Sequence, residues 1–395
     1  MVKWWAPFVT IFAVAFITAL ICTPIARLIA WKVGSVDYPG TRRVNRKPIP
    51  RMGGIAVFAA LAAAFLIGQI LFPMFHIPGF HSPEGLPVSK VNYLLVALGF
   101  LAIFVIGLVD DIVTLKPLQK FAGQIIAAAI TVSGGLVIDV VVNPFNSSAF
   151  ELGWLAYPIT VVYLVAYANI FNLIDGLDGL ASGIACIASA TMWLVSTLAG
   201  HFDAAALSLM LTGATLGFLR YNFNPASVFL GDSGSLLIGF TLGSISLMSV
   251  QRMPGLTSII VPLVIAGIPI IDTFSAIVRR GRAHVSIGQA DKGHIHHRLM
   301  DEGYNQKQTV LVIYAWTGLL CVGSIVMTQV DVIPRIAIFV LLVILSALFS
   351  MRLHLFKPVL LHHYNPSTGT DELVSPQDPE FEEEEEHFDE THVHF

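Results

Sequence analysis

The chain has 395 residues, of which 55% are hydrophobic and only 12% are charged. An ordinary soluble domain carries about 25% charged residues, so this composition excludes a soluble globular fold and predicts an all-α polytopic membrane protein. The formal net charge of −4 hides an asymmetry, because residues 371–395 hold eleven acidic residues and no Lys or Arg, which leaves 22 bases against 15 acids in the rest of the chain.

Eleven apolar stretches are long enough to cross a bilayer, whose core requires roughly 17 to 25 helical residues. Counts of ten or twelve remain open, because the fourth to seventh stretches are crowded. The first stretch lacks a small-residue cleavage site, so we expect a retained helix rather than a removable signal peptide. The predicted spans are residues 6–30, 53–72, 91–109, 119–138, 158–174, 179–199, 203–219, 232–250, 256–277, 308–328 and 333–350.

The basic residues sort to one side of these spans. With eleven spans, 18 of the 22 Lys and Arg residues fall on one face, and the other face has only Lys3, Lys90, Arg252 and Arg335. The positive-inside rule places the basic face in the cytoplasm. The N-terminus is then expected outside the cell and the C-terminus inside.

The end of the chain differs in composition from the rest. We expect residues 1–360 to form the transmembrane domain, with its active site at the cytoplasmic face. Residues 361–395 contain the run "FEEEEEHFDETHVHF", which is too acidic to build a core and predicts a disordered cytoplasmic tail. A regulatory or metal-sensing role for the histidines of this tail remains open.

Five polar islands interrupt the apolar sequence, and all fall at the cytoplasmic ends of the predicted helices. Scattered loop charges would not sort in this way, so the pattern indicates one composite site at the membrane surface. The islands are "RMGG" at 51–54, "DD" at 110–111 with Lys116 and Lys120, "NLIDGLDG" at 172–179, "GDSGS" at 231–235, and "ADKGHIHHRL" at 290–299.

The aspartates of these islands point to phosphate chemistry with a metal ion. Helices that begin near Asp178 and Asp232 direct their N-termini at the cytoplasm, where free N–H groups suit phosphate. Either aspartate alone is equally explained as a helix N-cap. Capping does not explain Asp110 and Asp111, which lie together at a helix C-terminus. With Asp175, five aspartates converge, and Mg²⁺ is the hard cation that binds through one or two carboxylates plus substrate phosphates.

The basic and histidine residues complete the predicted site. Lys120 opens a helix near the aspartate pair and is placed to contact phosphate. Asp272 lies seven residues before Arg279 on one helical face, either as the partner of that arginine or as part of the site. Zinc binding by the H-x-H-H run at 294–297 is disfavoured, because no Cys or evident acidic partner completes the ligand set. A topology signal explains the basic run equally well; the run comprises Arg279, Arg280 and Arg282.

Together these islands resemble the polyprenyl-phosphate N-acetylhexosamine-1-phosphate transferases, glycosyltransferase family 4, which include the phospho-MurNAc-pentapeptide translocases. The resemblance covers roughly residues 35 to 310. The segment "SIGQADKGHIHHRLMDEG" is similar to the bacterial undecaprenyl-phosphate N-acetylglucosamine-1-phosphate transferases, whereas the pentapeptide translocases typically carry three consecutive histidines followed by Phe-Glu.

The resemblance implies roles for individual residues. Asp232 would be the metal-binding aspartate, with Asp111 as a second ligand, and Lys120 would lie near the phosphates. Asp110 and Asp111 correspond to paired aspartates of which one acts as a base or contacts the lipid phosphate. The nucleotide and metal side of the cleft would be formed by Asn172, Asp175 and Asp178. His294, His296 and His297 would contact the diphosphate or the sugar, and the remaining substrate-binding residues would be Arg51, Arg279, Arg280 and Arg282.

The implied reaction transfers N-acetylglucosamine 1-phosphate from UDP-N-acetylglucosamine to undecaprenyl phosphate and releases UMP, as the first membrane step toward teichoic acid or another surface glycan. We expect Mg²⁺ as the cofactor, with Mn²⁺ as a substitute, a location in the bacterial cytoplasmic membrane, no nucleic-acid partner, and compatibility with a homodimer. A phosphate monoester has a second pKa near ~6, so the lipid phosphate is already nucleophilic, and we expect the aspartate pair to place groups rather than remove a proton. We also expect one-step attack rather than a covalent aspartyl-phosphate.

Alternatives remain open. The same chemistry on another UDP-N-acetylhexosamine or on UDP-MurNAc-pentapeptide would use the same islands. An ion-coupled transporter would also contain intramembrane acids, but its site is expected near the bilayer midplane rather than at one face.

Overall fold

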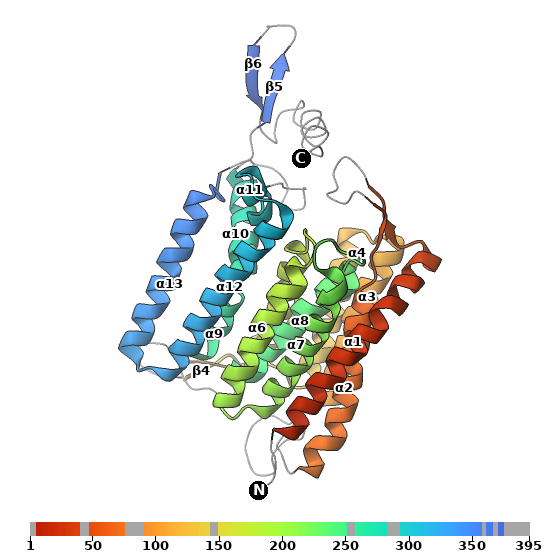
Figure 1. Cartoon of the computed structure of the whole chain (residues 1–395). Helices are drawn as coiled ribbons and strands as arrows, with labels where there is room; N and C mark the ends of the chain where they lie inside the picture. Colours follow the sequence, from red (N-terminus) through yellow and green to blue (C-terminus); the bar gives the residue numbers. More distant parts are fainter. Residues whose placement is uncertain are drawn as a thin grey trace.

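The computed structural model describes residues 5–39, 47–75, 91–142, 149–250, 257–282, 293–357, 361–365 and 370–374. These residues form a bundle of roughly parallel and antiparallel helices (Figure 1). The helices are α1 (Ala6–Val33), α2 (Gly54–Met74), α3 (Tyr93–Val113), α4 (Pro117–Ser133), α5 (Ala156–Leu173), α6 (Leu180–Leu198), α7 (Phe202–Asn222), α8 (Gly231–Val250), α9 (Thr257–Ile265), α10 (Gly267–Arg282), α11 (Ile295–Asp301), α12 (Gln306–Gln329) and α13 (Val332–Arg352), with a short 3₁₀ helix, η1, at Gly153–Leu155.

Three small antiparallel sheets accompany the helices, each of two strands. The strands are β1 (Val36–Asp37) with β2 (Ile49–Pro50), β3 (Val140–Val142) with β4 (Ala149–Glu151), and β5 (Leu361–Asn365) with β6 (Thr370–Val374). The last pair forms a hairpin inside the segment that composition predicts to be disordered. The acidic run that follows it lies outside the described residues, so the predicted tail and its boundary stay predictions.

Within the described part of the chain, eight helical segments are long and apolar enough to cross a membrane. They comprise α1, α2, α3, α5 with η1, α6, α7, α12 and α13. The chain is therefore a mostly helical, multi-pass membrane protein. Each of the eleven predicted spans coincides with helical structure over most of its length, although α4 has only 17 residues.

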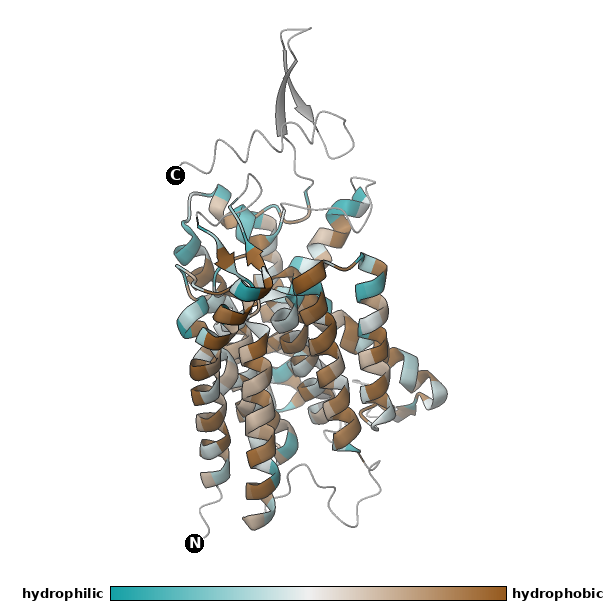
Figure 2. Cartoon of the chain, turned by 90° about the vertical axis from the view of Figure 1, so that its right-hand side faces the viewer, coloured by the Kyte–Doolittle hydropathy of each residue, from teal (hydrophilic) through white to brown (hydrophobic). Residues whose placement is uncertain are grey.

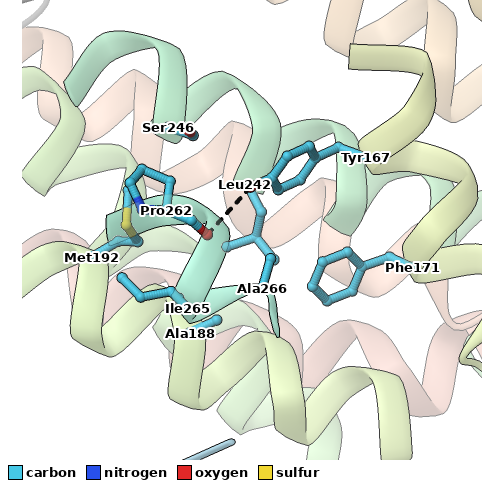
Figure 3. Close-up of a pocket in the computed structure, with 9 residues that line it drawn as sticks. All are labelled: Tyr167, Phe171, Ala188, Met192, Leu242, Ser246, Pro262, Ile265 and Ala266. Carbon is cyan, nitrogen blue, oxygen red and sulfur yellow. Dashed lines mark hydrogen bonds between the residues drawn. The ribbon is translucent and has the colours of Figure 1, made fainter. Parts of the chain in front are cut away.

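The ninth predicted span, 256–277, is not one helix. It divides at Ala266 into α9 and α10. Pro269 follows the break and has no N–H to donate to the carbonyl of Ile265, four residues earlier, so a continuous α-helix would lack that hydrogen bond. A small, mostly apolar pocket lies beside this break (Figure 3), and there the hydroxyl of Tyr167 donates to the carbonyl of Pro262 at 3.3 Å.

Helices α6, α7 and α8 occupy the centre of the bundle (Figure 1). In the most apolar 18-residue stretch of α7, 83% of the stretch is buried inside the protein. The corresponding share for α13, at the edge of the bundle, is only 11%. The outer helices instead expose large apolar side chains, among them Leu66, Leu94 and Ile333. Such a belt is unfavourable in water but matches the hydrocarbon of a bilayer. Figure 2 shows this belt along the helices, with hydrophilic residues concentrated toward the upper end of the bundle.

Two close backbone contacts bring the polar islands together at that end. A Cβ added to Gly107 of α3 would lie 2.6 Å from the carbonyl oxygen of Asp232, so only glycine lets α3 approach the first turn of α8 so closely. The segment before α2 pairs with the segment before α8, because Gly53 N donates to Phe229 O at 3.0 Å and Gly54 N donates to Leu230 O at 2.9 Å. The "RMGG" island is thus tied to the "GDSGS" island through the backbone.

Candidate active site

Lys120 lies at the centre of a polar cluster built by four helices. Its Nζ is 2.9 Å from Asp110 Oδ2 of α3 and 2.7 Å from Asp232 Oδ1 of α8. It also donates to Asn172 Oδ1 of α5 at 3.2 Å. One ammonium group at the start of α4 therefore joins two carboxylates and an amide whose positions in the chain are up to 122 residues apart.

Asn172 strengthens this cluster from the other side. Its Nδ2 donates to Asp232 Oδ1 and to Ser235 Oγ, the latter at 2.8 Å. Asp110 uses its second oxygen, Oδ1, to accept from Leu115 N at 2.7 Å, which closes the turn between α3 and α4. These hydrogen bonds hold the side chains of the cluster together.

Asp111 caps the N-terminus of α8 from the neighbouring helix. Its Oδ1 accepts from Asp232 N at 2.7 Å, and its Oδ2 accepts from Ser233 N at 3.0 Å and from Ser233 Oγ at 2.6 Å. The side chain is almost fully buried. The expectation that the first N–H groups of α8 are free for phosphate is therefore wrong, because the Asp111 carboxylate already accepts from two of them.

Asp178 anchors a loop and does not cap the helix that follows it. Its Oδ2 accepts from Asn224 Nδ2 at 3.0 Å and from Ala226 N at 2.9 Å. Asn224 also donates to Gln306 Oε1 at the start of α12, at 2.6 Å. Asp178 thereby fixes the segment between α7 and α8 that leads to Asp232.

Asp175 differs from the other aspartates because, among the described residues, no hydrogen bond reaches its carboxylate. The side chain is partly buried in the turn between α5 and α6. Burial, and then the carboxylates of Asp232, Asp111 and Asp178, raise the pKa of Asp175 well above its ordinary value. An added cation would relieve this repulsion.

The histidine run forms a second part of the site on α11, a short helix that hydropathy did not predict. Asp272 of α10 bonds His294 Nδ1 through Oδ2 at 2.8 Å and accepts from Ile295 N through Oδ1 at 2.8 Å. Of the two roles left open for Asp272, the structure favours membership of the site. Its carboxylate both orients the histidine and caps α11.

His296 joins the histidine run to the "DGLDG" turn. A Cβ added to Gly176 would lie 2.6 Å from His296 Nε2, so the ring packs directly on that glycine. The ring also lies between those of His294 and His297, with centroid distances of 5.8 and 4.3 Å. Burial, followed by the two neighbouring histidines, lowers the pKa of His296 well below its ordinary value, so the ring is neutral at pH 7.

The predicted substrate-binding arginines have varied surroundings. Arg279 is buried and donates to Ser275 Oγ at 3.0 Å and to the carbonyl of Leu355. Arg282 is exposed and donates to the carbonyl of Phe356 at 3.0 Å. Arg280 is partly buried on the same helix, and Arg51 lies beside Phe229 through a backbone bridge. The structure thus gives Arg279 and Arg282 partners in the chain itself.

The residues present fit a Mg²⁺ ion bound together with substrate. Among the described residues, no group of three or more His, Cys, Asp or Glu side chains is arranged to hold a metal, which gives no support to a zinc site at the histidines. Mg²⁺ needs only one or two carboxylates when phosphates supply the rest. Asp175 and Asp232 suit this role better than Asp111, whose oxygens already accept three hydrogen bonds.

Known proteins are similar to this chain along most of its length. The family model described as glycosyl transferase family 4 matches residues 93–250. A probable undecaprenyl-phosphate N-acetylglucosaminyl 1-phosphate transferase of Bacillus subtilis is 38% identical over 86% of this chain and 90% of its own length. A decaprenyl-phosphate N-acetylglucosaminephosphotransferase of Mycolicibacterium smegmatis is 36% identical over 79% of this chain and 81% of its own. A phospho-N-acetylmuramoyl-pentapeptide-transferase of Halalkalibacterium halodurans is 29% identical over 72% of this chain and 85% of its own.

Proposed function

Because the chain belongs to glycosyl transferase family 4, we propose that it transfers N-acetylglucosamine 1-phosphate from UDP-N-acetylglucosamine to undecaprenyl phosphate and releases UMP. The observation that carries the proposal is the contact of Lys120 with Asp110, Asp232 and Asn172 at one end of an apolar bundle. That position suits a reaction between a water-soluble nucleotide and a lipid phosphate. The name of the Bacillus subtilis relative describes this transfer to undecaprenyl phosphate, and that of the Mycolicibacterium smegmatis relative describes an N-acetylglucosamine phosphotransferase that uses decaprenyl phosphate.

In phosphoryl transfer a protein mainly positions groups and stabilises charge. Lys120 carries a fixed positive charge in a partly desolvated cluster, where it is placed to stabilise the diphosphate. Asp110 and Asn172 hold that ammonium group in position. Asp175 and Asp232 would hold a Mg²⁺ ion, which would supply positive charge against the negative charge of the diphosphate. Asp111 holds the first turn of α8, and with it the backbone of Asp232, rather than removing a proton.

The histidines complete the donor side of the proposed site. His296 is neutral and packs on the turn that carries Asp175, so it is suited to hydrogen-bond a sugar or phosphate oxygen without adding charge. Asp272 orients His294 in the same way that a carboxylate orients a histidine in other polar sites. The surface glycan that this step would feed, teichoic acid or another, stays a prediction.

We also propose eleven crossings of the bacterial cytoplasmic membrane, with the N-terminus outside and the active site facing the cytoplasm. In support, α1 begins and α13 ends at opposite ends of the bundle (Figure 1), which requires an odd number of crossings. Among the described basic residues, Lys120 contacts the carboxylates of Asp110 and Asp232, and Arg279 lies against Gly293 just before His294, so the positive-inside rule favours the cytoplasm for this end. This location also disfavours the transporter alternative, because its site would lie midway along the helices.

Release of UMP by the purified, lipid-reconstituted protein tests the proposed reaction. We expect release with UDP-N-acetylglucosamine, undecaprenyl phosphate and Mg²⁺, and loss of release when EDTA removes the metal. Lys120→Met should lower turnover by about 10²- to 10³-fold, the effect of removing one charge-stabilising donor. Lys116→Met is the matched control, since Lys116 is exposed one turn earlier, and its turnover should match the unmodified protein.

The same assay separates the alternatives. Parallel reactions with UDP-N-acetylgalactosamine and UDP-MurNAc-pentapeptide identify a different donor if only one of them supports release. Release with UDP-N-acetylglucosamine that persists in Lys120→Met would contradict the role of the cluster. If folded protein releases no UMP with any of these nucleotide sugars, the transferase assignment itself is rejected.

A further inference from the structure

Helix α13 lies at the edge of the bundle and packs chiefly on α12. Only 11% of its most apolar window is buried. The residues immediately after it are different, because Leu353 and Leu355 are 4% and 0% exposed. The end of the most peripheral helix is therefore docked into the protein more deeply than the helix itself.

A specific turn directs the chain inward at this point. Leu355 N donates to Ser350 O at 3.1 Å, and His354 N donates to Met351 O at 3.1 Å, which is the Schellman pattern of a helix C-terminus. His354 occupies the left-handed position of that pattern, with a φ of +52°. Its side chain is exposed, so its contribution is the backbone conformation alone.

Three arginines bind the three carbonyls that follow the turn. Arg279 donates to Leu355 O, Arg282 donates to Phe356 O at 3.0 Å, and Arg298 donates to Lys357 O at 2.9 Å. Carbonyls beyond a helix C-terminus lack helical partners and lie at the negative end of the helix dipole. Cationic donors are the natural complement, and we call the three carbonyls of residues 355–357 the carbonyl latch.

The latch connects directly to the histidine part of the site. Arg279 and Asp272 lie seven residues apart on one face of α10. A Cβ added to Gly293 would lie 2.3 Å from Arg279 Nε, so the guanidinium group supports the backbone just before His294. Arg298 belongs to α11, the helix that carries His296. The latch therefore bonds to both elements that hold the histidines.

We infer that the carbonyl latch is a positioning element of the active site, which fixes α10 against α11 and thereby sets the Asp272–His294 pair that faces the nucleotide-sugar donor. The inference rests on the proposed function for its kinetic consequence. It assigns Arg279, Arg282 and Arg298 to holding the site together through the end of α13. Donor binding then depends on a turn at the far edge of the bundle.

His354→Val and His354→Gly form a matched pair for testing the latch. Glycine accepts a positive φ freely, whereas a β-branched residue strongly disfavours it. We expect His354→Val to raise the KM for UDP-N-acetylglucosamine about tenfold, the scale of a left-handed backbone penalty. The KM for undecaprenyl phosphate should not change, and His354→Gly should match the unmodified protein in both constants.

A double-substitution cycle shows whether the turn acts through Arg279. Arg279→Met removes the buried donor and should raise the donor KM in the same way as His354→Val. If both act through the latch, the combined protein should be no worse than Arg279→Met alone. If the two substitutions instead raise the donor KM independently, so that their effects add in free energy in the combined protein, the inference is overturned.

A second measurement does not depend on catalysis. Trypsin must capture the Arg298 guanidinium and unfold α11 locally before it cleaves there, so the cleavage rate, followed by mass spectrometry, reports latch opening. His354→Val should be cleaved faster than His354→Gly. If His354→Val and His354→Gly are cleaved at the same rate, the inference is overturned. It is also overturned if the two variants are cleaved at different rates but have the same KM for UDP-N-acetylglucosamine. If no UDP-sugar releases UMP but cleavage separates the pair as expected, the latch stands and the proposed function fails.

Discussion

Asp111 and Asp175 bring the same side chain to the same end of the bundle, yet their surroundings give them opposite tasks. The Asp111 carboxylate accepts three hydrogen bonds from the first turn of α8. That of Asp175 receives none from the described residues, and its pKa is raised by burial and by neighbouring carboxylates. One group is satisfied by the protein, whereas the other requires a cation or a proton.

Asp175→Asn tests this distinction through the pH dependence of stability. Because the folded-state pKa of Asp175 exceeds its ordinary value of 3.8, its favourable contribution is complete below that value and is lost as pH rises through the folded-state pKa. In EDTA, the melting temperature of the unmodified protein in detergent should therefore fall relative to that of Asp175→Asn as pH rises. With Mg²⁺ and UDP-N-acetylglucosamine together, the unmodified protein should gain stability and the variant should not, while turnover of the variant drops about 10²-fold.

Asp111→Asn is the comparison for that experiment. Its amide group would present an N–H donor to the N–H groups of α8, so we expect a loss of about 1–3 kcal/mol with or without Mg²⁺. Identical pH profiles for the unmodified protein and Asp175→Asn would contradict the assignment of Asp175. A Mg²⁺-dependent loss in Asp111→Asn would return Asp111 to the metal site.

At this scale, the sequence predicts which residue types form the site and on which face of the bundle they lie. It does not predict which residues bond to one another. The sequence pattern indicates that Asp110, Lys120 and Asp232 belong to one face, and the structure joins them within hydrogen-bonding distance. The bond from Ser233 to Asp111 spans 122 residues, and no local rule reveals it. Asp272 was left between two roles for the same reason, because the histidine that it binds lies 22 residues away.

At the scale of elements, the helix ends of the site are completed by other helices. Asp111 of α3 caps α8, Asp272 of α10 caps α11, and arginines of α10 and α11 bind the carbonyls after α13. Sequence rules for caps look for a residue beside the helix end. Such rules place the caps at Asp178 or Asp232, where the structure shows other contacts.

Gly231→Ala tests the tight junction at the start of α8. Gly231 has a φ of +73°, and an added Cβ would lie 2.7 Å from both oxygens of Asp111. Gly200→Ala is the matched control, since Gly200 has a φ of +77° with no atom within 4 Å of the added Cβ. Both variants should lose about 1–2 kcal/mol of unfolding free energy, because alanine disfavours the left-handed backbone conformation. Only Gly231→Ala should also lose UMP release. Both the melting temperature and UMP release are measured for each variant. Equal behaviour of the two variants would show that the Asp111 contact is unimportant.

Hydropathy predicted where the long helices lie, because an apolar run of bilayer length has few alternatives to a helix. It could not predict the division at Ala266, since the proline that follows the break leaves the apolar run unbroken. It also missed α11, whose seven residues are too short and too polar to form a span. The histidine motif was therefore recognised without the helix that carries it.

At the scale of the whole molecule, the polar site and the apolar belt divide the surface by height along the bundle. The hydrophilic residues gather toward the upper end (Figure 2), the end at which α11 lies (Figure 1). An active site there can meet a nucleotide from solution and a phosphate anchored at the bilayer surface. Which side of the membrane this end faces follows from charge, not from packing.

Labelling of single cysteines tests that orientation. In a variant with Cys22, Cys186 and Cys321 replaced by serine, Asp331→Cys would lie between α12 and α13, and Lys116→Cys between α3 and α4; both parent residues are exposed. These connections lie at opposite ends of the bundle (Figure 1). A membrane-impermeant maleimide should label Asp331→Cys in intact cells and Lys116→Cys only after permeabilisation. The reverse pattern would place the basic connections outside, against the positive-inside rule, and would remove the carboxylates from cytoplasmic nucleotides. Labelling of both in intact cells would contradict the bundle itself, because an apolar belt of this height separates the two ends.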